Sequence, residues 1–366
     1  MDLDDYFADF TARDWQTTAE GTVRTALVGL GEFAREHVLP ALDRADERDR
    51  RSFCEVTALV SGSPEKARAV ADEYGIDRTL DYDEFEAGDG TDAFEAVYVA
   101  GPNALHLDHA RTAAAHGKHV LCEKPIEASA ERAREMVRVC EEAGVTLMVG
   151  YRPQVEPAMR RLRELIRAGM LGEPVQFHGW FTGHILGDDA ATDQWRLDPD
   201  LAGGGALLDV GVYPLNAARF LLDADPVAVQ AATHAPEAPF EGVDEHVAFQ
   251  LEFPEGTTAS CTASYHAQPD DRLRIVGTEG QAELHPAFDS EITPTLTIKR
   301  GDERFAHTGA FVNEVAEEFD YFAHCVLTDA TPEPDGRDGA ADMNAVEAIY
   351  ESAETGRRIA INDTTA

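Results

Sequence analysis

A short glycine-containing segment directly after an apolar run is the feature that most constrains this fold. The run Val23–Leu30 is typical of a buried strand, and Gly29-Leu30-Gly31-Glu32-Phe33-Ala34 leads from it into a helix. The two glycines permit a tight turn close to a pyrophosphate, and the small Ala34 lets the helix pack on the strand. The helix N-terminus then faces the anion. We expect a dinucleotide to contact Gly29, Gly31, Glu32, Phe33 and Ala34, although the glycines could simply make a tight turn.

The pattern from Val23 to about Gly150 alternates apolar strands with helices. Further strands are expected at Val56–Val60, Ala96–Ala100, His119–Cys122 and Thr146–Val149, and helices at Pro64–Tyr74, Ala104–His116 and Ala130–Ala143. Continuous apolar strands separated by helices of this length are typical of a parallel sheet covered on both faces. This part is therefore predicted to be an α/β Rossmann domain.

The pattern changes after about residue 173. Strands are expected at Val175–Gly183, Val227–Thr233, His246–Phe253, Thr257–His266, Arg272–Gly277 and Gln281–His285. Turn signals separate the last four, at Pro254-Glu255-Gly256, Gln268-Pro269-Asp270 and Gly277-Thr278-Glu279-Gly280. Helices are expected at Gly211–Leu222, Asn313–Leu327 and Asp338–Gly356. We predict an N-terminal arm over 1–22, the Rossmann domain over 23–150, and an α+β domain with an open, mainly antiparallel sheet over 151–366.

The charge balance excludes several classes of partner. The chain has 69 acidic and 31 basic residues, a formal net charge of −38. Such a chain repels nucleic acid and anionic lipid. The acidic residues are spread along the chain and form no tail, which favours adaptation to high salt, where self-repulsion is screened. Lysine occurs only at Lys66, Lys118, Lys124 and Lys299, so we expect each lysine to have a specific role.

Other features indicate a cytoplasmic protein. No apolar run reaches the roughly 18–20 residues that cross a bilayer, and Met1-Asp2-Leu3-Asp4-Asp5 has no feature of a secretory signal. The five cysteines form no C-x-x-C pair and no zinc-type cluster. We expect no membrane segment, no metal site and reduced, buried thiols.

The end of the second strand indicates which dinucleotide binds. NAD enzymes usually place an acidic residue there to hold the ribose 2′-hydroxyl. Here Ser61-Gly62-Ser63-Pro64-Glu65-Lys66 follows the strand, with hydroxyls and a scarce lysine in place of the acid. Ser61, Ser63 and Lys66 are therefore predicted to bind the 2′-phosphate of NADP. The alternative is that the serines cap the next helix and Lys66 is solvated.

Two further segments carry candidate catalytic groups. Glu123-Lys124-Pro125 ends a parallel strand, where ligands bind in open α/β sheets, and a lysine there can stabilise a developing alkoxide. The alternative is a surface ion pair between Lys124 and Glu123. Asp209 and Tyr213 would share one helix face at i, i+4 spacing. On the residues alone, Tyr213 could equally be a core tyrosine, and Asp209 a helix cap.

Four motifs follow the glycine-rich turn in order: Gly101-Pro102-Asn103-x-x-His106, Gly117-Lys118-His119-Val120, Glu123-Lys124-Pro125 and Gly150-Tyr151-Arg152. Together they resemble the glucose–fructose oxidoreductase, inositol dehydrogenase and rhizopine catabolism (Gfo/Idh/MocA) family, from about Val23 to Ile361. The resemblance implies catalytic roles for Lys124, Asp209 and Tyr213. It also implies cofactor contacts at Pro102, Asn103, His106, Glu123, Lys124, Arg152, Trp195 and Arg196, of which the last three also line the sugar pocket.

The resemblance extends to the expected reaction. The opening segment and the abundant acid are similar to the branch of the family in halophilic archaea that oxidises D-xylose. This implies NADP-dependent oxidation of the aldopentose at C1 to its lactone, with Tyr213 as general base, Lys124 favouring its phenolate and Asp209 positioning sugar hydroxyls. Alternatives are a glucose–fructose oxidoreductase, another aldose or dihydrodiol dehydrogenase, or a non-catalytic cofactor or sugar sensor. A homodimer or homotetramer is also implied.

Overall fold

The computed structural model describes residues 3–8, 13, 15, 19–43, 52–184 and 194–361. The chain divides into two compact units. The parallel-sheet unit comprises Trp15–Arg152 and Asn313–Ala340, and the open-sheet unit comprises Met1–Asp14, Pro153–Val312 and Ala341–Ala366. Of the predicted arm over 1–22, residues 3–8, 13, 15 and 19–22 are described, and the domain boundaries predicted from the sequence stay a prediction. No described helix is long and apolar enough to cross a membrane.

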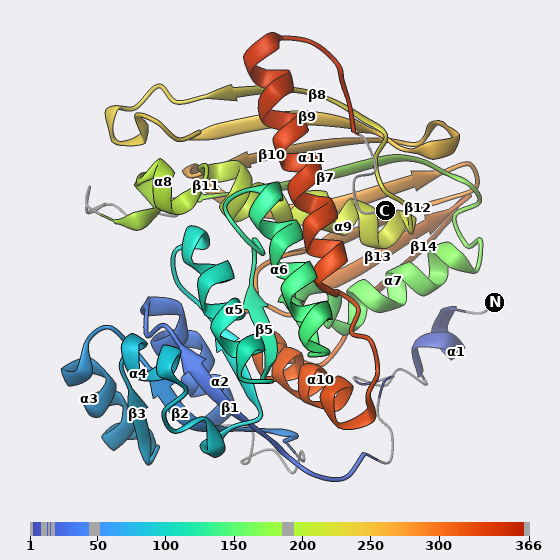
Figure 1. Ribbon diagram of the computed structural model, residues 1–366. Helices are drawn as coiled ribbons and strands as arrows, with labels where there is room; N and C mark the ends of the chain where they lie inside the picture. The colour runs from blue at the N-terminus through green and yellow to red at the C-terminus, as the bar shows by residue number, and fades with distance from the viewer. Residues whose placement is uncertain are drawn as a thin grey trace. The chain divides into compact units, whose positions relative to one another are not determined.

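The parallel-sheet unit holds six parallel strands in the order β3-β2-β1-β4-β5-β6. Figure 1 labels β1, β2, β3 and β5 of this sheet. The strands are β1 Val23–Val28, β2 Cys54–Val60, β3 Arg78–Leu80, β4 Ala96–Val99, β5 His119–Glu123 and β6 Leu147–Gly150. The helices are the π-helical turn η1 Ala34–Val38, α2 Leu39–Asp43, α3 Pro64–Tyr74, α4 Tyr82–Ala87, α5 His106–Ala115, α6 Ala130–Ala143 and α10 Glu314–Thr328. The strand order reverses between β1 and β4, which is where dinucleotides bind in such sheets.

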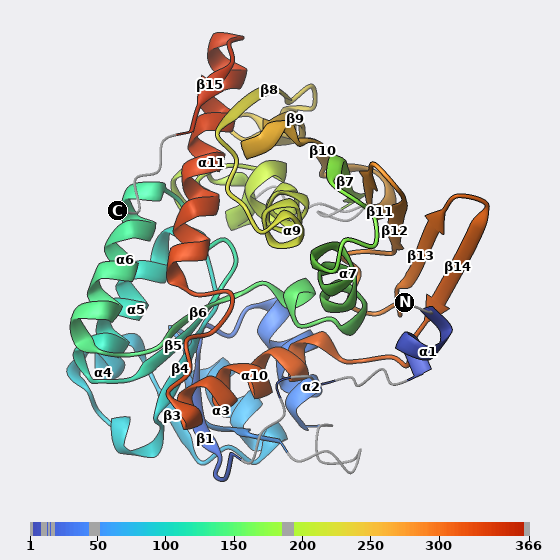
Figure 2. The same cartoon turned by 90° about the vertical axis from the view of Figure 1, so that its right-hand side faces the viewer.

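Helices cover both faces of this sheet, as Figure 2 shows. Side chains of α2, α3 and α10 share one core with Leu27, Leu59 and Tyr98 of the strands, and Phe319 and Phe322 of α10 are fully buried in it. On the other face, α5 and α6 pack on each other and α5 contacts β4 and β5. The predicted Rossmann fold is confirmed, with the addition of α10 from far along the chain.

Local sequence signals set the helix ends in this unit. Helix α3 begins after Ser63, whose side chain caps the backbone amide of Lys66, with Pro64 in the first turn and Gly75 at the end. Helix α6 is built the same way, between the cap Ser129 and Gly144. Because these signals are local, both helices occupy the predicted residues.

The open-sheet unit holds a nine-stranded sheet in the order β14-β13-β12-β11-β7-β10-β9-β8-β15. Its strands are β7 Pro174–His184, β8 Ala228–His234, β9 His246–Glu252, β10 Thr258–Ser264, β11 His266–Gly277, β12 Gln281–His285, β13 Thr295–Arg300, β14 Glu303–Thr308 and β15 Ile359–Ala360. Strands β7 and β10 pair in parallel and the other neighbours are antiparallel. The predicted open, mainly antiparallel sheet is therefore confirmed.

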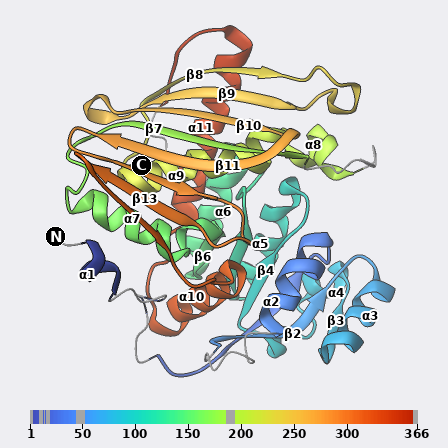
Figure 3. The ribbon, with the colours of Figure 1, turned by 180° about the vertical axis from the view of Figure 1, so that it is seen from behind.

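Helices of this unit lie on one face of the sheet. They are α1 Leu3–Ala8, α7 Pro157–Arg167, α8 Pro199–Ala202, the π-helical turn η7 Leu207–Gly211, α9 Val212–Leu222 and α11 Gly336–Thr355, which begins in the other unit. Helix α9 packs on β7 and β10, and α7 on β12 and β13. Figure 3 shows the opposite face, which no described helix of this unit covers.

One turn predicted from the sequence is wrong. Gln268-Pro269-Asp270 lies inside β11 and does not end a strand. The pairing of β11 with β7 shifts register between His266 and Asp270. A proline lacks the amide hydrogen that a regular ladder needs, and such an irregularity accommodates it. Strand β11 pairs with β7, so β10 and β11 are not neighbours in the sheet and form no hairpin.

A buried carboxyl at the N-terminus of helix α7 should make the stability of the fold depend on pH. Glu156 caps the helix by accepting the amide hydrogen of Met159 at 2.8 Å and is 7% exposed. Burial raises the pKa of Glu156 from 4.5 to about 7. A carboxyl whose pKa is raised by folding destabilises the folded state as pH rises from the unfolded pKa to the folded one, because the unfolded chain ionises first.

We expect the wild type to lose about 2–3 kcal/mol of unfolding free energy relative to Glu156→Gln between pH 5 and pH 8. Glutamine keeps a cap acceptor but cannot ionise. Urea unfolding in molar KCl measures the difference, with the exposed Glu173→Gln as the control. A constant difference between the wild type and Glu156→Gln across this range would contradict the prediction.

Candidate active site

The turn after β1 has the geometry that a pyrophosphate needs. Gly29 adopts a φ of +98°, and its amide donates to the carbonyl of Val60 at 3.0 Å. A Cβ at Gly29 would lie 1.8 Å from the carbonyl oxygen of Ala100, so no other residue fits. A Cβ at Gly31 would meet no protein atom within 4 Å. Gly31 and Glu32 are exposed, whereas Ala34 is buried under the helix. The turn therefore presents open backbone on the side where a dinucleotide would lie.

The segment after β2 combines a helix N-terminus with a cation. The amide of Ser63 donates to the hydroxyl of Ser61 at 3.2 Å, and the amide of Lys66 donates to the hydroxyl of Ser63 at 3.4 Å. Ser63 thus caps α3, as the alternative interpretation held, but a hydroxyl that accepts one hydrogen bond can still donate one. Lys66 is exposed, and no hydrogen bond or ion pair of its side chain occurs within the described residues. A helix N-terminus beside a solvated ammonium suits an anionic group.

The loops after β4 and β5 are joined by His106. Its Nδ1 lies 3.1 Å from the carbonyl oxygen of Pro125 and its Nε2 lies 3.2 Å from that of Gly101. Burial lowers the pKa of His106 to about 4, against the effect of the two carbonyls. The side chain is 1% exposed. Its contacts therefore position the loop that carries Lys124, and Asn103, 4% exposed, lies in the other loop that it holds.

Lys124 follows β5 at the carboxyl edge of the sheet. The side chain of Glu123 accepts a hydrogen bond from the amide of Lys124 at 3.2 Å and another from the hydroxyl of Tyr98 at 2.7 Å. Removal from water raises the pKa of Glu123, and the ammonium of Lys124 acts in the opposite direction. The sequence-based alternative paired the two residues at the surface, but both are partly buried.

Buried charges of α10 lie behind this loop. Arg152 is 7% exposed and its guanidinium pairs with Glu314 at 2.7 Å. Glu318 is 1% exposed, and its Oε1 has no hydrogen-bond partner among the described residues. Burial, reinforced by the negative charge of Glu123, raises the pKa of Glu318 well above its usual value. Arg152, predicted as a cofactor contact, therefore offsets part of the negative charge of Glu123, Glu314 and Glu318.

The open-sheet unit brings Arg196, Asp209 and Tyr265 together. The Nε of Arg196 donates to Oδ2 of Asp209 at 3.0 Å, and the hydroxyl of Tyr265 lies 3.3 Å from the same oxygen. The guanidinium of Arg196 also lies over the ring of Trp195, 4.7 Å from its centroid. Trp195 and Arg196, predicted as cofactor contacts, thus lie in the same unit as the predicted substrate residue Asp209.

Tyr213 lies in the first turn of helix α9, within an aromatic cluster. Its ring lies 5.5 Å from Phe181 of β7 and 5.8 Å from Phe288, and the residue is 6% exposed. Asp209 precedes it in the π-helical turn η7, which runs directly into α9. π-helical turns are rare and often occur at functional sites. The second described one, η1, lies directly after the glycine-rich turn.

Two family models match this chain. The one described as "Oxidoreductase family, NAD-binding Rossmann fold" matches residues 23–151, and "GFO/IDH/MocA C-terminal domain" matches residues 159–283. The chain belongs to the Gfo/Idh/MocA family. Its parallel-sheet unit is an NAD(P)-binding Rossmann domain, and the chain is an oxidoreductase. The predicted family is confirmed.

Individual Gfo/Idh/MocA relatives match over nearly the whole chain. The D-xylose 1-dehydrogenase (NADP(+)) of Haloarcula marismortui is 44% identical over 97% of this chain and 98% of its own length. D-xylose 1-dehydrogenase (NADP(+)) 2 of Haloferax volcanii is 34% identical over 92% of this chain and 99% of its own length. Among solved structures, the aldose-aldose oxidoreductase of Caulobacter crescentus in complex with glycerol is 33% identical, with a TM-score of 0.85 over 93% of this chain and 99% of that one.

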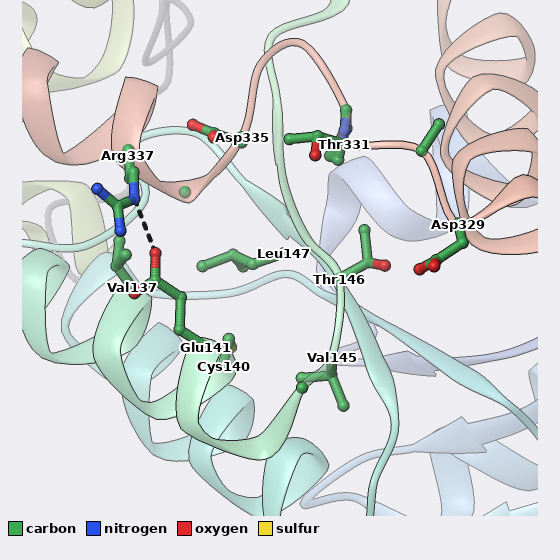
Figure 4. A pocket seen from close by; sticks show the side chains of 14 residues that line it. Val137, Cys140, Glu141, Val145, Thr146, Leu147, Asp329, Thr331, Asp335 and Arg337 are labelled. Atoms are coloured by element: carbon green, nitrogen blue, oxygen red, sulfur yellow. Dashed lines mark hydrogen bonds and ion pairs between the residues drawn. The ribbon is translucent and has the colours of Figure 1, made fainter.

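The pocket in Figure 4 is separate from the predicted site. It measures about 380 Å³ and is lined by the C-terminal part of α6, the start of β6 and the segment from Asp329 to Arg337. Arg337 pairs with Glu141 there at 2.7 Å. The pocket lies at the amino end of β6, whereas the predicted cofactor residues of the same unit lie at or after the carboxyl ends of β1, β2, β4, β5 and β6. Within the described ranges, no group of three or more His, Cys, Asp or Glu is arranged to hold a metal.

The predicted residues of this Gfo/Idh/MocA chain fall into two groups. One is in the parallel-sheet unit: Gly29, Gly31, Glu32, Phe33, Ala34, Ser61, Ser63, Lys66, Pro102, Asn103, His106, Glu123, Lys124 and Arg152. The other is in the open-sheet unit: Trp195, Arg196, Asp209 and Tyr213. Sequence analysis missed Tyr265, Asp244, Tyr98 and Glu318. No local motif marks these residues, and the side-chain hydrogen-bond partners of Tyr265, Asp244 and Tyr98 lie at least 25 residues away in the sequence.

Proposed function

We propose that this chain catalyses the NADP-dependent oxidation of D-xylose at C1 to the corresponding lactone. The observation that carries the proposal is the 44% identity, over 97% of the chain, to the D-xylose 1-dehydrogenase (NADP(+)) of Haloarcula marismortui. The net charge of −38 fits a protein that works in high salt. Membership of the Gfo/Idh/MocA family supports a homodimer or homotetramer as the assembled form.

In this proposal, the residues at the carboxyl ends of β1 and β2 hold NADP. The backbone at Gly29 and Gly31 receives the pyrophosphate, because the turn at Gly29 admits only glycine and a Cβ at Gly31 would meet no protein atom within 4 Å. Ser61, Ser63 and Lys66 receive the 2′-phosphate, because no acidic residue ends β2 and Lys66 is exposed beside the N-terminus of α3. When bound, NADP supplies the acceptor for the hydride that leaves C1.

Lys66 then sets the cofactor preference. We expect Lys66→Ala to raise the KM for NADP about tenfold, because a charge-assisted contact to the 2′-phosphate is lost, and to leave the KM for NAD unchanged. Initial rates with each cofactor measure both constants. The matched control is Lys299→Ala, which removes an exposed lysine of β13 in the open-sheet unit. An equal change with NADP and NAD would remove Lys66 from this role.

The chemistry at the sugar is assigned to three side chains. Tyr213, acting as its phenolate, accepts the proton of the C1 hydroxyl, and the positive charge of Lys124 favours that phenolate and stabilises the negative charge that develops on the C1 oxygen. Asp209 accepts hydrogen bonds from sugar hydroxyls. The sugar thus loses one proton to the protein and one hydride to the cofactor, which gives the lactone without a metal.

D-Xylose carrying deuterium at C1 tests the position of oxidation. We expect the deuterium at C4 of the reduced nicotinamide and a lactone or aldonate as the sugar product, both observed by NMR. Deuterium retained in an oxidised sugar would place the oxidation at another carbon.

The second candidate is an aldose-aldose oxidoreductase. It is favoured by the 33% identity and TM-score of 0.85 to the Caulobacter crescentus enzyme of that name. Such an enzyme would oxidise one aldose and reduce another without added cofactor. NADP that remains bound after extensive dialysis, together with cofactor-free conversion of two sugars, would favour this candidate over a dehydrogenase.

A further inference from the structure

We propose that Tyr265 is a positioning residue of the substrate site, which holds the carboxylate of Asp209 in the orientation that receives the sugar. The inference rests on the function proposed above. Tyr265 lies between β10 and β11, 56 residues after Asp209 in the sequence. No family motif quoted above includes it.

The contact between the two residues is direct. The Tyr265 hydroxyl lies 3.3 Å from Oδ2 of Asp209, and Arg196 donates to the same oxygen at 3.0 Å. Two donors therefore converge on one carboxylate oxygen. Burial, with the charges of Asp209 and Asp244, raises the pKa of Tyr265 well above its usual value. The hydroxyl consequently stays protonated over the working pH range and remains a donor.

The main chain of Tyr265 is fixed as firmly as its side chain. The residue is 2% exposed, and its amide donates to the carbonyl of Glu245 at 3.0 Å. A buried ring with an anchored backbone has little freedom to leave Asp209. Arg196, in contrast, is about one-third exposed at its side chain (32%), so Tyr265 is the more rigid of the two donors.

Asp244, next to Glu245 in the sequence, anchors the chain just before Asp209. The carboxylate of Asp244 accepts the amides of Gly205 at 2.8 Å and Leu207 at 2.7 Å, and the hydroxyl of Tyr350 donates to it at 2.6 Å. The carbonyl of Asp244 accepts the amide of Ala206 at 2.8 Å. Residues 244 and 245 thus hold both the start of the turn that carries Asp209 and the backbone of Tyr265.

This anchoring requires a glycine at position 205. A Cβ there would lie 2.0 Å from the carbonyl oxygen of Asp244, so the backbones approach more closely than any side chain allows. The amide of Asp209 in turn donates to the carbonyl of Gly205 at 3.1 Å. The hydrogen bonds therefore run without a break from α11, through Asp244 and the turn η7, to Asp209 and Tyr265.

This arrangement predicts an effect on sugar binding rather than on chemistry. Removing the hydroxyl leaves Asp209 with one fewer donor, so its carboxylate no longer has a single orientation. Contacts that Asp209 makes equally in the ground state and the transition state change KM and leave kcat unchanged. We expect Tyr265→Phe to raise the KM for D-xylose about tenfold, as for a hydrogen bond to a charged group, with kcat and the KM for NADP unchanged.

The matched control is Tyr6→Phe. Tyr6 also donates its hydroxyl to a carboxylate of the open-sheet unit, that of Glu164 on α7, at 2.5 Å. We expect it to leave the KM for D-xylose unchanged. The thermal midpoint of both variants shows whether Tyr265→Phe merely weakens the fold, which would alter kcat and both KM values together.

A double-mutant cycle with Asp209→Asn gives the decisive readout. If Tyr265 acts through Asp209, Tyr265→Phe should change the KM less than about twofold in the Asp209→Asn background. An unchanged KM in Tyr265→Phe, or an equal effect in both backgrounds, overturns the inference while leaving the proposed function intact. A wild type that oxidises no aldose overturns the proposed function, and this inference with it.

Discussion

Replacing Tyr213 by phenylalanine is expected to lower kcat for D-xylose oxidation by roughly 10²–10⁴-fold, the range for loss of a general base. The ring of Tyr213 packs against those of Phe181 and Phe288, which also stack on each other. A phenylalanine keeps these ring contacts, so the variant removes only the phenolic oxygen that, as the phenolate, would accept the C1 proton. The expected loss is therefore in kcat, with the fold intact.

Stopped-flow or steady-state formation of NADPH measures this change, and Tyr6→Phe is again the control. The thermal midpoint of Tyr213→Phe should stay near that of the wild type. A variant with normal turnover would remove Tyr213 from the role of general base and favour the alternative of a core tyrosine.

Replacing Lys124 by methionine is expected to lower kcat by roughly 10²–10³-fold, as when one charge-stabilising group is removed from an active site. Methionine has a long apolar side chain but no charge to stabilise the developing oxyanion. The loop itself should persist, because His106 still contacts the carbonyls of Gly101 and Pro125.

Lys118→Met is the matched control for Lys124→Met. Its ammonium donates to the carbonyls of Thr91 and Phe94, at 2.7 and 2.9 Å, away from the carboxyl edge of the sheet. Lys118→Met should lower the thermal midpoint and leave kcat unchanged. Lys124→Met should lower kcat and leave the thermal midpoint unchanged. Similar effects of both variants on kcat would contradict a catalytic role for Lys124.

Much of the fold follows from local signals in the sequence. Helices α3 and α6 occupy the predicted residues because a serine cap and a glycine stop mark each of them. The helix α10 was predicted, but not its place in the core of the parallel-sheet unit. That packing depends on contacts such as Phe319 with Tyr98, between residues far apart in the sequence.

The candidate site was predictable only where a motif is short and local. The glycine-rich turn and the loop of Lys124 are such motifs, and both lie at the carboxyl ends of parallel strands. The turn η7 was not predicted, because nothing local distinguishes a π-helical turn from the start of an α-helix. Tyr265 was missed because its partner Asp209 is 56 residues away.

The scarcity of lysine indicated which lysines matter, but not what each of them does. It singled out Lys66 and Lys124 as residues with a reason to be present. The structure supplies a different reason for Lys118, whose ammonium satisfies two backbone carbonyls. Composition can thus show that a residue matters, whereas only the structure shows whether it binds a ligand or stabilises the chain.

The most direct test of the account is the initial rate of NADPH formation in molar KCl, with D-xylose, D-glucose and L-arabinose supplied in turn and each repeated with NAD. The account predicts fast turnover of D-xylose with NADP and little with NAD. Folded protein that binds NADP but oxidises none of the three sugars would contradict it.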